Sequence, residues 1–206
     1  MIERLILVRH GETVHNVRGI AQGWSDSDLS ETGMAQVKDV ARRLASFRPT
    51  SVYSSSLARA TTTAETIAAA LKLEMIVLDE LREMNCGRWE GQPFVAVRRD
   101  EADYFARWSA DPTVPCPDGE SYADVRERIL KAMARVESDS ERFGPRPVLV
   151  SHGTAIRIAA TALLDIPLQS ARHFAQENAA INVFERRGGR FILERWNDTN
   201  HREARG

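Results

Sequence analysis

The chain has 206 residues, a formal net charge of −1 and a hydrophobic fraction of 43%. This composition predicts one globular domain spanning residues 1–206, and the near-zero charge argues against a protein that binds nucleic acid or an anionic membrane through its overall field. Two cysteines without a CxxC pair argue against a disulfide framework or a structural zinc site. We therefore expect a cytoplasmic protein with neither a signal peptide nor a membrane-spanning segment.

The first predicted element is a strand that ends in a cation and an imidazole. Residues 5–8 are four consecutive apolar side chains, a pattern typical of a strand buried on both faces. Arg9, His10 and Gly11 follow at once. Ligands of open α/β sheets bind outside the carboxyl ends of the strands, so Arg9 and His10 lie where such a fold places its chemistry.

A polar segment without clear periodicity, residues 14–28, is predicted to form a long loop, and long loops in compact domains are usually functional. It carries Asn16 and Gln22, whose neutral amides could contact an anion. Both are also common turn residues, and that alternative stays open.

Two helices with a strand between them follow. Ser30 is a suitable N-cap for a helix over 31–47, residues 51–54 form a short strand, and a second helix covers 57–71. Arg59 falls in the first turn of that second helix, where a cation opposes the helix dipole. A bound anion would explain Arg59, and a surface ion pair is the alternative.

Residues 74–78 read as another strand, and the segment 79–91 after it carries three glutamates, Glu80, Glu83 and Glu90. A carboxylate in this segment can project toward the same edge of the sheet, but the pattern alone does not select one of the three. A helix over 94–108 and a turn-rich break at 111–119 then suggest an insertion at about 94–119. We expect it to cover the site, and a surface excursion without ligand contact is the alternative.

A helix over 121–143 leads into a second strand that ends in histidine and glycine. Residues 148–150 are apolar, and Ser151, His152 and Gly153 follow before a helix over 154–164. If the two strands are neighbours, His10 and His152 meet, whereas two separate hydrogen-bonded core histidines are the alternative. Runs at 181–185 and 190–196 around Gly188-Gly189 predict a hairpin. The alternation predicts an α/β fold, a three-layer α/β/α sandwich whose mostly parallel sheet has an antiparallel edge.

Two guanidinium groups and two imidazoles converging on one point describe a site for a dianion, most naturally a phosphoryl group. The sequence lacks HxH, HExxH, a GxxxxGK[ST] loop and a GxSxG elbow, so metal hydrolysis, a nucleotide loop and a serine nucleophile all fit poorly. A covalent route through histidine needs no metal, and we expect no cofactor.

The segment Leu7–Thr13 resembles the RHG signature of the histidine phosphatase superfamily, the phosphoglycerate mutase-like proteins. The resemblance extends along nearly the whole chain. Further segments that are similar in order and spacing are Asn16, Gln22-Gly23, Leu29-Ser30-Glu31-Thr32-Gly33, Ser54-Ser55-Ser56-Leu57-Ala58-Arg59-Ala60, Thr63-Ala64, Leu81-Arg82-Glu83, Gly87-Arg88-Trp89-Glu90-Gly91, Gly119-Glu120-Ser121 and Ser151-His152-Gly153.

This resemblance implies a fold like that of phosphoglycerate mutase and a role for each matched residue. His10 would be the nucleophile that becomes phosphohistidine, and Glu83 would be the proton donor. Arg9, Arg59 and His152 would hold the phosphoryl oxygens, with Asn16 assisting. The remaining matched positions expected to bind substrate are Gln22, Gly23 and Gly153.

The motifs around Glu83 are similar to those of the phosphatase branch. The mutases differ from this chain in two ways, since they carry another motif around that glutamate and a longer insert before the second histidine. We therefore expect a metal-independent phosphomonoester phosphatase acting on a small phosphorylated metabolite. A phosphoglycerate-mutase-type phosphotransferase and a non-catalytic phosphate-binding or regulatory protein are the alternatives. Tyr104, Phe105 and Trp108 suggest an apolar pocket, Arg98 and Arg99 could instead recognise a second anionic group, and a monomer or homodimer is expected.

Overall fold

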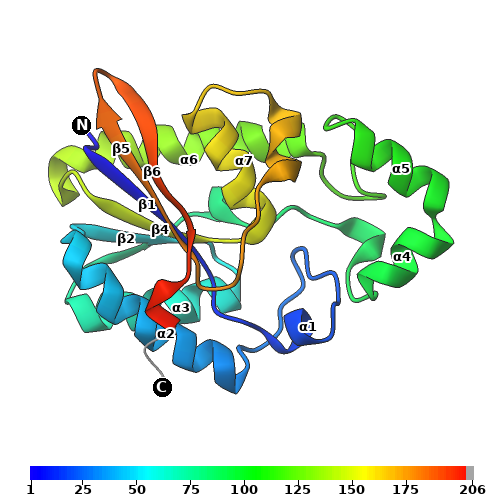
Figure 1. Ribbon diagram of the computed structural model, residues 1–206, viewed down its shortest axis with the longest axis horizontal. Helices are drawn as coiled ribbons and strands as arrows, with labels where there is room; N and C mark the ends of the chain where they lie inside the picture. The colour runs from blue at the N-terminus through cyan, green and yellow to red at the C-terminus, as the bar shows by residue number, and fades with distance from the viewer. Residues whose placement is uncertain (203–206) are drawn as a thin grey trace.

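The computed structural model describes residues 1–202 and has a six-stranded sheet at its centre (Figure 1). The strand order is β3-β2-β4-β1-β5-β6, with β3, β2, β4 and β1 parallel and β5 and β6 antiparallel. The strands are β1 (Arg4–Arg9), β2 (Ser51–Ser54), β3 (Met75–Val77), β4 (Pro147–Ser151), β5 (Ile181–Arg187) and β6 (Arg190–Asp198). The predicted α/β fold with an antiparallel edge is confirmed.

Helices cover both faces of the sheet, with α2 and α3 on one face and α6 and α7 on the other (Figure 1). The helices are α1 (Val14–Val17), α2 (Glu31–Leu44), α3 (Ala58–Leu71), α4 (Phe94–Asp100), α5 (Ala102–Ala110), α6 (Tyr122–Phe143) and α7 (Gly153–Leu163). Short 3₁₀ segments add Ala45–Phe47, Asp79–Leu81, Gly87–Trp89, Leu168–His173 and Asn200–Arg202. No helix within residues 1–202 combines the length and the apolar character that a membrane crossing needs.

The apolar run of residues 5–8 in β1 explains why helices cover both faces of the sheet. Ile6 and Val8 pack in the cluster under α2 and α3, while Leu5 and Leu7 pack in the cluster under α6 and α7. Successive side chains of a strand point to opposite faces, so four apolar residues in a row need an apolar layer on each side. All four are 2% exposed or less.

The observed boundaries differ from the predicted ones in three places. The segment 14–28 is not all loop, because Thr13 caps the one-turn helix α1 in a capping box with Asn16. The helix predicted over 94–108 divides into α4 and α5 at Glu101, whose backbone leaves the helical region (φ −120°, ψ 40°). The helix predicted over 31–47 ends at Leu44, and its last turn is 3₁₀.

The start of α2 packs directly on the backbone that follows His10. Ser30 donates its backbone N–H to the carbonyl oxygen of Glu12 (2.8 Å), and its hydroxyl accepts the N–H of Gly33 (3.0 Å). A Cβ atom at Gly33 would collide with the backbone of Glu12. Glycine at this helical position therefore allows the close approach that fixes the segment after His10.

Replacing Gly33 with alanine tests this close contact. In an open helix the change would add about 1 kcal/mol of helix propensity. Here we expect Gly33→Ala to lower the free energy of unfolding by about 1–3 kcal/mol in urea titrations, because the new methyl group overpacks a buried contact. The exposed neighbour provides the control, Thr32→Ala, which should stay within about 0.5 kcal/mol of the parent. A stabilised Gly33→Ala variant would contradict the packing argument.

Candidate active site

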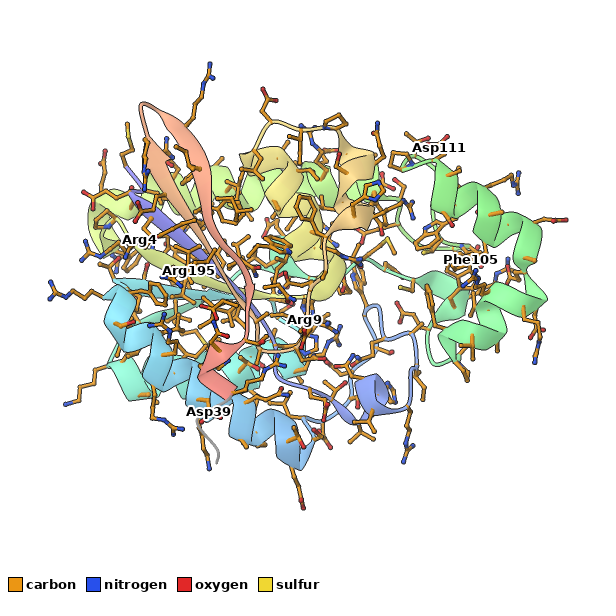
Figure 2. The ribbon with its side chains drawn as sticks, in the orientation of Figure 1. Arg4, Arg9, Asp39, Phe105, Asp111 and Arg195 are labelled. Carbon is orange, nitrogen blue, oxygen red and sulfur yellow. The ribbon has the colours of Figure 1, made fainter. Side chains whose placement is uncertain are left out.

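The carboxyl ends of β1 and β4 bring the two predicted histidines together. The strands pair in parallel with Arg9 opposite Ser151, and His10 donates its backbone N–H to the carbonyl oxygen of Ser151 (3.0 Å). The ring centroids of His10 and His152 are 5.1 Å apart. The alternative of two separate core histidines is therefore excluded. Figure 2 labels Arg9 where β1 ends, in the interior of the molecule.

The surroundings of His10 leave one ring nitrogen free for chemistry. Its Nδ1 lies 2.7 Å from the carbonyl oxygen of Gly11, and a carbonyl can only accept, so Nδ1 carries the proton. Nε2 then keeps its lone pair. Burial, and next the positive charges of Arg59 and Arg9, hold the pKa of His10 well below its usual value. The imidazole is therefore neutral at neutral pH, as a nucleophile must be.

His152 is completely buried beside His10. Its Nε2 lies 2.8 Å from the hydroxyl oxygen of Ser55, which accepts the backbone N–H of Leu57 (3.2 Å) and keeps its own hydrogen to donate. Its Nδ1 is buried and has no hydrogen-bond partner among the described residues. Burial is the largest cause that holds the pKa of His152 well below its usual value, followed by the charge of Arg59. In the tautomer in which Nε2 accepts the Ser55 hydroxyl, Nδ1 carries the single proton of the neutral ring and can donate one hydrogen bond to an oxygen anion.

Arg9 is held by a backbone carbonyl and not by a carboxylate. Its Nη1 donates to the carbonyl oxygen of Gln176 (2.6 Å), and its buried Nε has no hydrogen-bond partner within the described part of the chain. Burial lowers the pKa of Arg9 to about 10, so the guanidinium remains charged at neutral pH. Gly153 lies against this guanidinium, behind the pocket wall.

Arg59 is 2% exposed, although it begins a helix. It donates to the carbonyl oxygens of Ser25 (2.8 Å) and Gly23 (2.7 Å) and pairs with Asp26 (3.0 Å). The alternative of an ion pair is thus partly correct. Asp26 also accepts the backbone N–H of Ala58 (2.8 Å) and thereby caps α3, whose N-cap residue Leu57 makes no side-chain hydrogen bond. The buried Nε–H of Arg59 has no hydrogen-bond partner in residues 1–202 and is therefore an unused donor.

The structure distinguishes the three glutamates of the segment 79–91. Glu83 lines the pocket, and its carboxylate accepts the backbone N–H groups of Met84 (2.8 Å), Thr154 (3.1 Å) and Ala155 (3.2 Å). The last two belong to the first turn of α7, whose dipole favours a carboxylate. Glu90 instead accepts backbone N–H groups of Trp24, Ser25 and Cys86, which ties two loops together. Glu80 is not a lining residue of this pocket.

Asn16 and Gln22 reach the same pocket from the loop around α1. The side-chain oxygen of Asn16 accepts hydrogen bonds from the backbone N–H of Thr13 (3.1 Å) and from the Nδ2 of Asn178 (2.9 Å). The side-chain oxygen of Gln22 accepts the hydroxyl of Thr13 (3.1 Å). With the oxygens occupied, the amide N–H groups are the parts left to face a ligand. Gly23 combines φ +52° with a position where a Cβ would collide with the Glu90 carboxylate.

These residues enclose a pocket of about 250 Å³. Of the predicted site residues, Arg9, His10, Asn16, Gln22, Gly23, Arg59 and Glu83 line it, whereas His152 and Gly153 lie behind the wall. The lining also includes a set of apolar side chains, which are Ile20, Ala21, Met84, Phe94, Trp108 and Tyr122. Trp108 and Phe94 come from α5 and α4, so the segment 94–119 does contact the pocket. Phe105, labelled between these helices in Figure 2, packs on Trp108 with ring centroids 5.3 Å apart.

Several residues at the site escaped sequence reasoning. Arg157 lines the pocket from α7, and Ser55 and Asn178 hold His152 and Asn16. An arginine inside a helix and a serine or asparagine in a loop are ordinary in any sequence, so no local signal distinguishes them. Arg98 and Arg99 are exposed and do not line the pocket. Residues 1–202 hold no group of three His, Cys, Asp or Glu side chains placed to bind a metal ion.

Comparison with known proteins agrees with this geometry. The family model of the histidine phosphatase superfamily (branch 1) matches residues 5–199. The chain is 35% identical over 199 residues to phosphoserine phosphatase 1 of Hydrogenobacter thermophilus, covering 96% of this chain and 93% of that protein. It is 33% identical to a metal-independent phosphoserine phosphatase of Arabidopsis thaliana, covering 100% of this chain and 85% of the relative.

Other relatives carry different names. A probable phosphoglycerate mutase of Shigella boydii is 32% identical, with coverage of 98% of this chain and 95% of the relative. Among solved structures, a mycobacterial glucosyl-3-phosphoglycerate phosphatase complexed with VO3 superposes with a TM-score of 0.87 at 31% identity, covering 95% of this chain and 98% of that one. The chain belongs to the histidine phosphatase superfamily, branch 1.

Proposed function

We propose that this protein hydrolyses small phosphomonoesters that carry a carboxylate, through a phosphohistidine formed at His10. The observation that carries the proposal is the state of His10. Its Nδ1 is bonded to the Gly11 carbonyl oxygen, its Nε2 keeps a lone pair, and burial together with two buried guanidinium groups lowers its pKa. A neutral imidazole inside a cationic pocket is suited to attack a phosphoryl dianion.

In the first step the Nε2 lone pair of His10 forms a bond to phosphorus as the bond to the leaving oxygen breaks. Charge remains on the three equatorial oxygens of the phosphoryl group. Arg9 and Arg59 supply fixed positive charge, and the Nδ1 of His152 and the amide of Asn16 supply neutral donors. Because the two guanidinium groups are already held by backbone carbonyls, they need little reorganisation.

Glu83 is the proton donor of the first step and the proton acceptor of the second. Once protonated, it donates to the leaving alkoxide, whose basicity otherwise opposes departure. As a carboxylate it then takes a proton from the water that attacks phosphorus and displaces His10 Nε2. The first turn of α7 and the N–H of Met84 hold the carboxyl group at the pocket throughout.

Arg157 is the residue from which we infer a carboxylate on the substrate. Its Nε donates to the carbonyl oxygen of Gly153 (3.1 Å) and its Nη2 to the hydroxyl of Thr154 (3.1 Å), which folds it onto the start of α7. The helix dipole disfavours a cation there, and no carboxylate within residues 1–202 pairs with it. Phosphoserine and glucosyl-3-phosphoglycerate, named for two relatives, both contain a carboxylate.

The neutral state of the two imidazoles has a consequence for stability. His10 and His152 have lowered pKa values in the folded protein, whereas in the unfolded chain they titrate near 6.5. Below pH 6.5 the unfolded state therefore binds more protons, and the free energy of unfolding falls as the pH decreases. Two protons give a slope of up to about 2.7 kcal/mol per pH unit. Above pH 6.5 the two histidines are mainly neutral in the unfolded chain as well, so they no longer lower the free energy of unfolding.

Urea titrations between pH 7.5 and 5 measure this slope. We expect His10→Gln to reduce it by up to about 1.4 kcal/mol per pH unit, the share of one proton. The exposed His173 provides the control, and His173→Gln should leave the slope unchanged. An unchanged slope in His10→Gln would mean that His10 has the same pKa in the folded and unfolded protein, which contradicts the lowered pKa that its burial and cationic neighbours imply.

Replacing Arg157 tests the substrate class. We expect Arg157→Met to raise KM for phosphoserine and 3-phosphoglycerate by about tenfold to a hundredfold, the value of a charge-assisted hydrogen bond. KM for p-nitrophenyl phosphate, which lacks a carboxylate, should change by less than about threefold. All assays contain EDTA, because the proposed steps use no metal. Arg98→Met is the matched control, and equal losses for all three substrates would assign Arg157 to the phosphoryl site or to the fold.

A phosphoglycerate-mutase-type transfer is the second candidate, favoured by the relative named as a probable mutase. The acceptor distinguishes the two reactions. With 3-phosphoglycerate and a 2,3-bisphosphoglycerate primer, we expect inorganic phosphate to accumulate, because water is the proposed acceptor. Formation of 2-phosphoglycerate without matching phosphate release would establish the transferase instead. Neither product would form if the chain were a non-catalytic phosphate-binding protein.

A further inference from the structure

Arg128, on the second turn of α6, donates three hydrogen bonds to backbone carbonyl oxygens of the segment around Glu83. Its Nη1 donates to the carbonyl oxygens of Glu80 (2.9 Å) and Arg82 (2.6 Å). Its Nη2 donates to the carbonyl oxygen of Glu83 (2.8 Å). Glu80 belongs to the short 3₁₀ segment Asp79–Leu81, and Arg82 and Glu83 follow it in irregular chain, so no α-helix or strand ladder satisfies these three carbonyls.

Glu120 holds the guanidinium of Arg128 in this orientation. Its two carboxylate oxygens accept the Nε (2.8 Å) and Nη2 (2.9 Å) of Arg128, a bidentate pair. The side chains are 14% and 18% exposed, so water screens the pair only partly. Glu120 also exchanges two hydrogen bonds with the backbone of Asn85, two residues beyond Glu83. All five N–H groups of Arg128 are thereby occupied.

The contacts restrain the backbone of Glu83, whose side chain lines the pocket. Its carboxylate is bonded to the start of α7, and its backbone carbonyl accepts both Arg128 Nη2 and the indole N–H of Trp24 (2.8 Å). A carboxyl group that passes protons to a leaving oxygen and from a water must keep its place within a fraction of an ångström. A loop bonded only through the carboxylate would not meet that requirement.

We propose that the Arg128–Glu120 pair is a positioning device for Glu83, and that its contribution to the reaction appears only in the steps in which Glu83 moves a proton. The inference rests on the proposed function, in which Glu83 is the proton carrier. Neither Arg128 nor Glu120 lines the pocket, so neither touches substrate. A pair that only stabilised the fold would affect every substrate alike, and this difference separates the two roles.

Arg128→Lys is the test substitution. Lysine keeps the positive charge, which also acts on His152, but its single ammonium cannot reach three carbonyls and two carboxylate oxygens together. The measured quantity is the first-turnover rate of phosphoenzyme formation at saturating substrate. Phosphoserine must expel a basic alkoxide and needs the proton, whereas p-nitrophenyl phosphate expels a weak base and hardly needs it.

We expect Arg128→Lys to slow the phosphoserine reaction at least tenfold and the p-nitrophenyl phosphate reaction less than threefold. In a Glu83→Gln background, Arg128→Lys should add less than a twofold further loss for phosphoserine, because the group that it positions is already absent. The control on the same helix is Arg135→Lys, an exposed residue paired with Asp139, and it should change neither rate.

Trp24→Phe provides a second, milder variant in case Arg128→Lys does not fold. It removes only the indole N–H that also holds the Glu83 carbonyl, and it should show the same preference for loss with phosphoserine. Equal losses for both substrates in these variants, or a full additional loss in the Glu83→Gln background, would overturn the positioning role while leaving the proposed function intact. Equal losses in Glu83→Gln itself would overturn the proton role of Glu83 and the inference with it.

Discussion

The parallel pairing of β1 with β4 is the constraint on which the site depends. The pairing sets Arg9 opposite Ser151, so the residues that follow each strand, His10 and His152, emerge side by side at one edge of the sheet. A shift of β1 by one residue would bring Arg4 or Arg9 into a position that an apolar side chain now fills under a helical layer. The two helical layers, each packed on its own half of those side chains, therefore fix the histidines as firmly as they fix the core.

Burying two cations beside two imidazoles is costly, and the structure offsets this cost mainly with backbone. Carbonyl oxygens of Gln176, Gly23 and Ser25 accept from Arg9 and Arg59, and Asp26 is the carboxylate in an ion pair with either of them in the described chain. Partial charges of this kind orient the guanidinium groups without neutralising them. The Nε–H groups of Arg9 and Arg59 and the Nδ1 of His152 have no hydrogen-bond partner within residues 1–202, so the backbone leaves part of the hydrogen-bonding capacity of these groups unused.

Much of this arrangement can be predicted from the sequence because it depends on patterns of strong physical meaning. The apolar run before His10 indicates a strand that is covered by apolar layers on both faces. A second such run before His152 indicates another buried strand that can pair with the first. Arg59 was recognisable because a cation opposes the dipole at a helix start. The choice among Glu80, Glu83 and Glu90 was different, because it depends on which carboxylate reaches the start of α7, a contact between segments about 70 residues apart. Only the family resemblance favoured Glu83 beforehand, and the backbone contacts of Glu90 now give it another role.

The limits of prediction lie where the local sequence pattern does not decide the local structure. Asp26 caps α3 from a loop about 30 residues earlier, and Glu101 interrupts a helix whose apolar spacing continues through it. In both cases the local pattern is compatible with the wrong answer. Arg128 and Arg157 are further examples, because an arginine on a helix surface is unremarkable until its neighbours are known.

In the proposed mechanism, the site divides its chemistry between two kinds of structure. Groups that hold a phosphoryl charge should not move, and Arg9, His10 and His152 stand at strand ends while Arg59 stands at a helix start. The proton carrier has to serve a leaving oxygen and then a water, and Glu83 lies on an irregular segment that can present its carboxylate to both. An irregular segment lacks the internal hydrogen bonds that fix a strand or a helix, so its order must be supplied from outside. Side chains on other elements, Arg128 on α6 foremost among them, provide it.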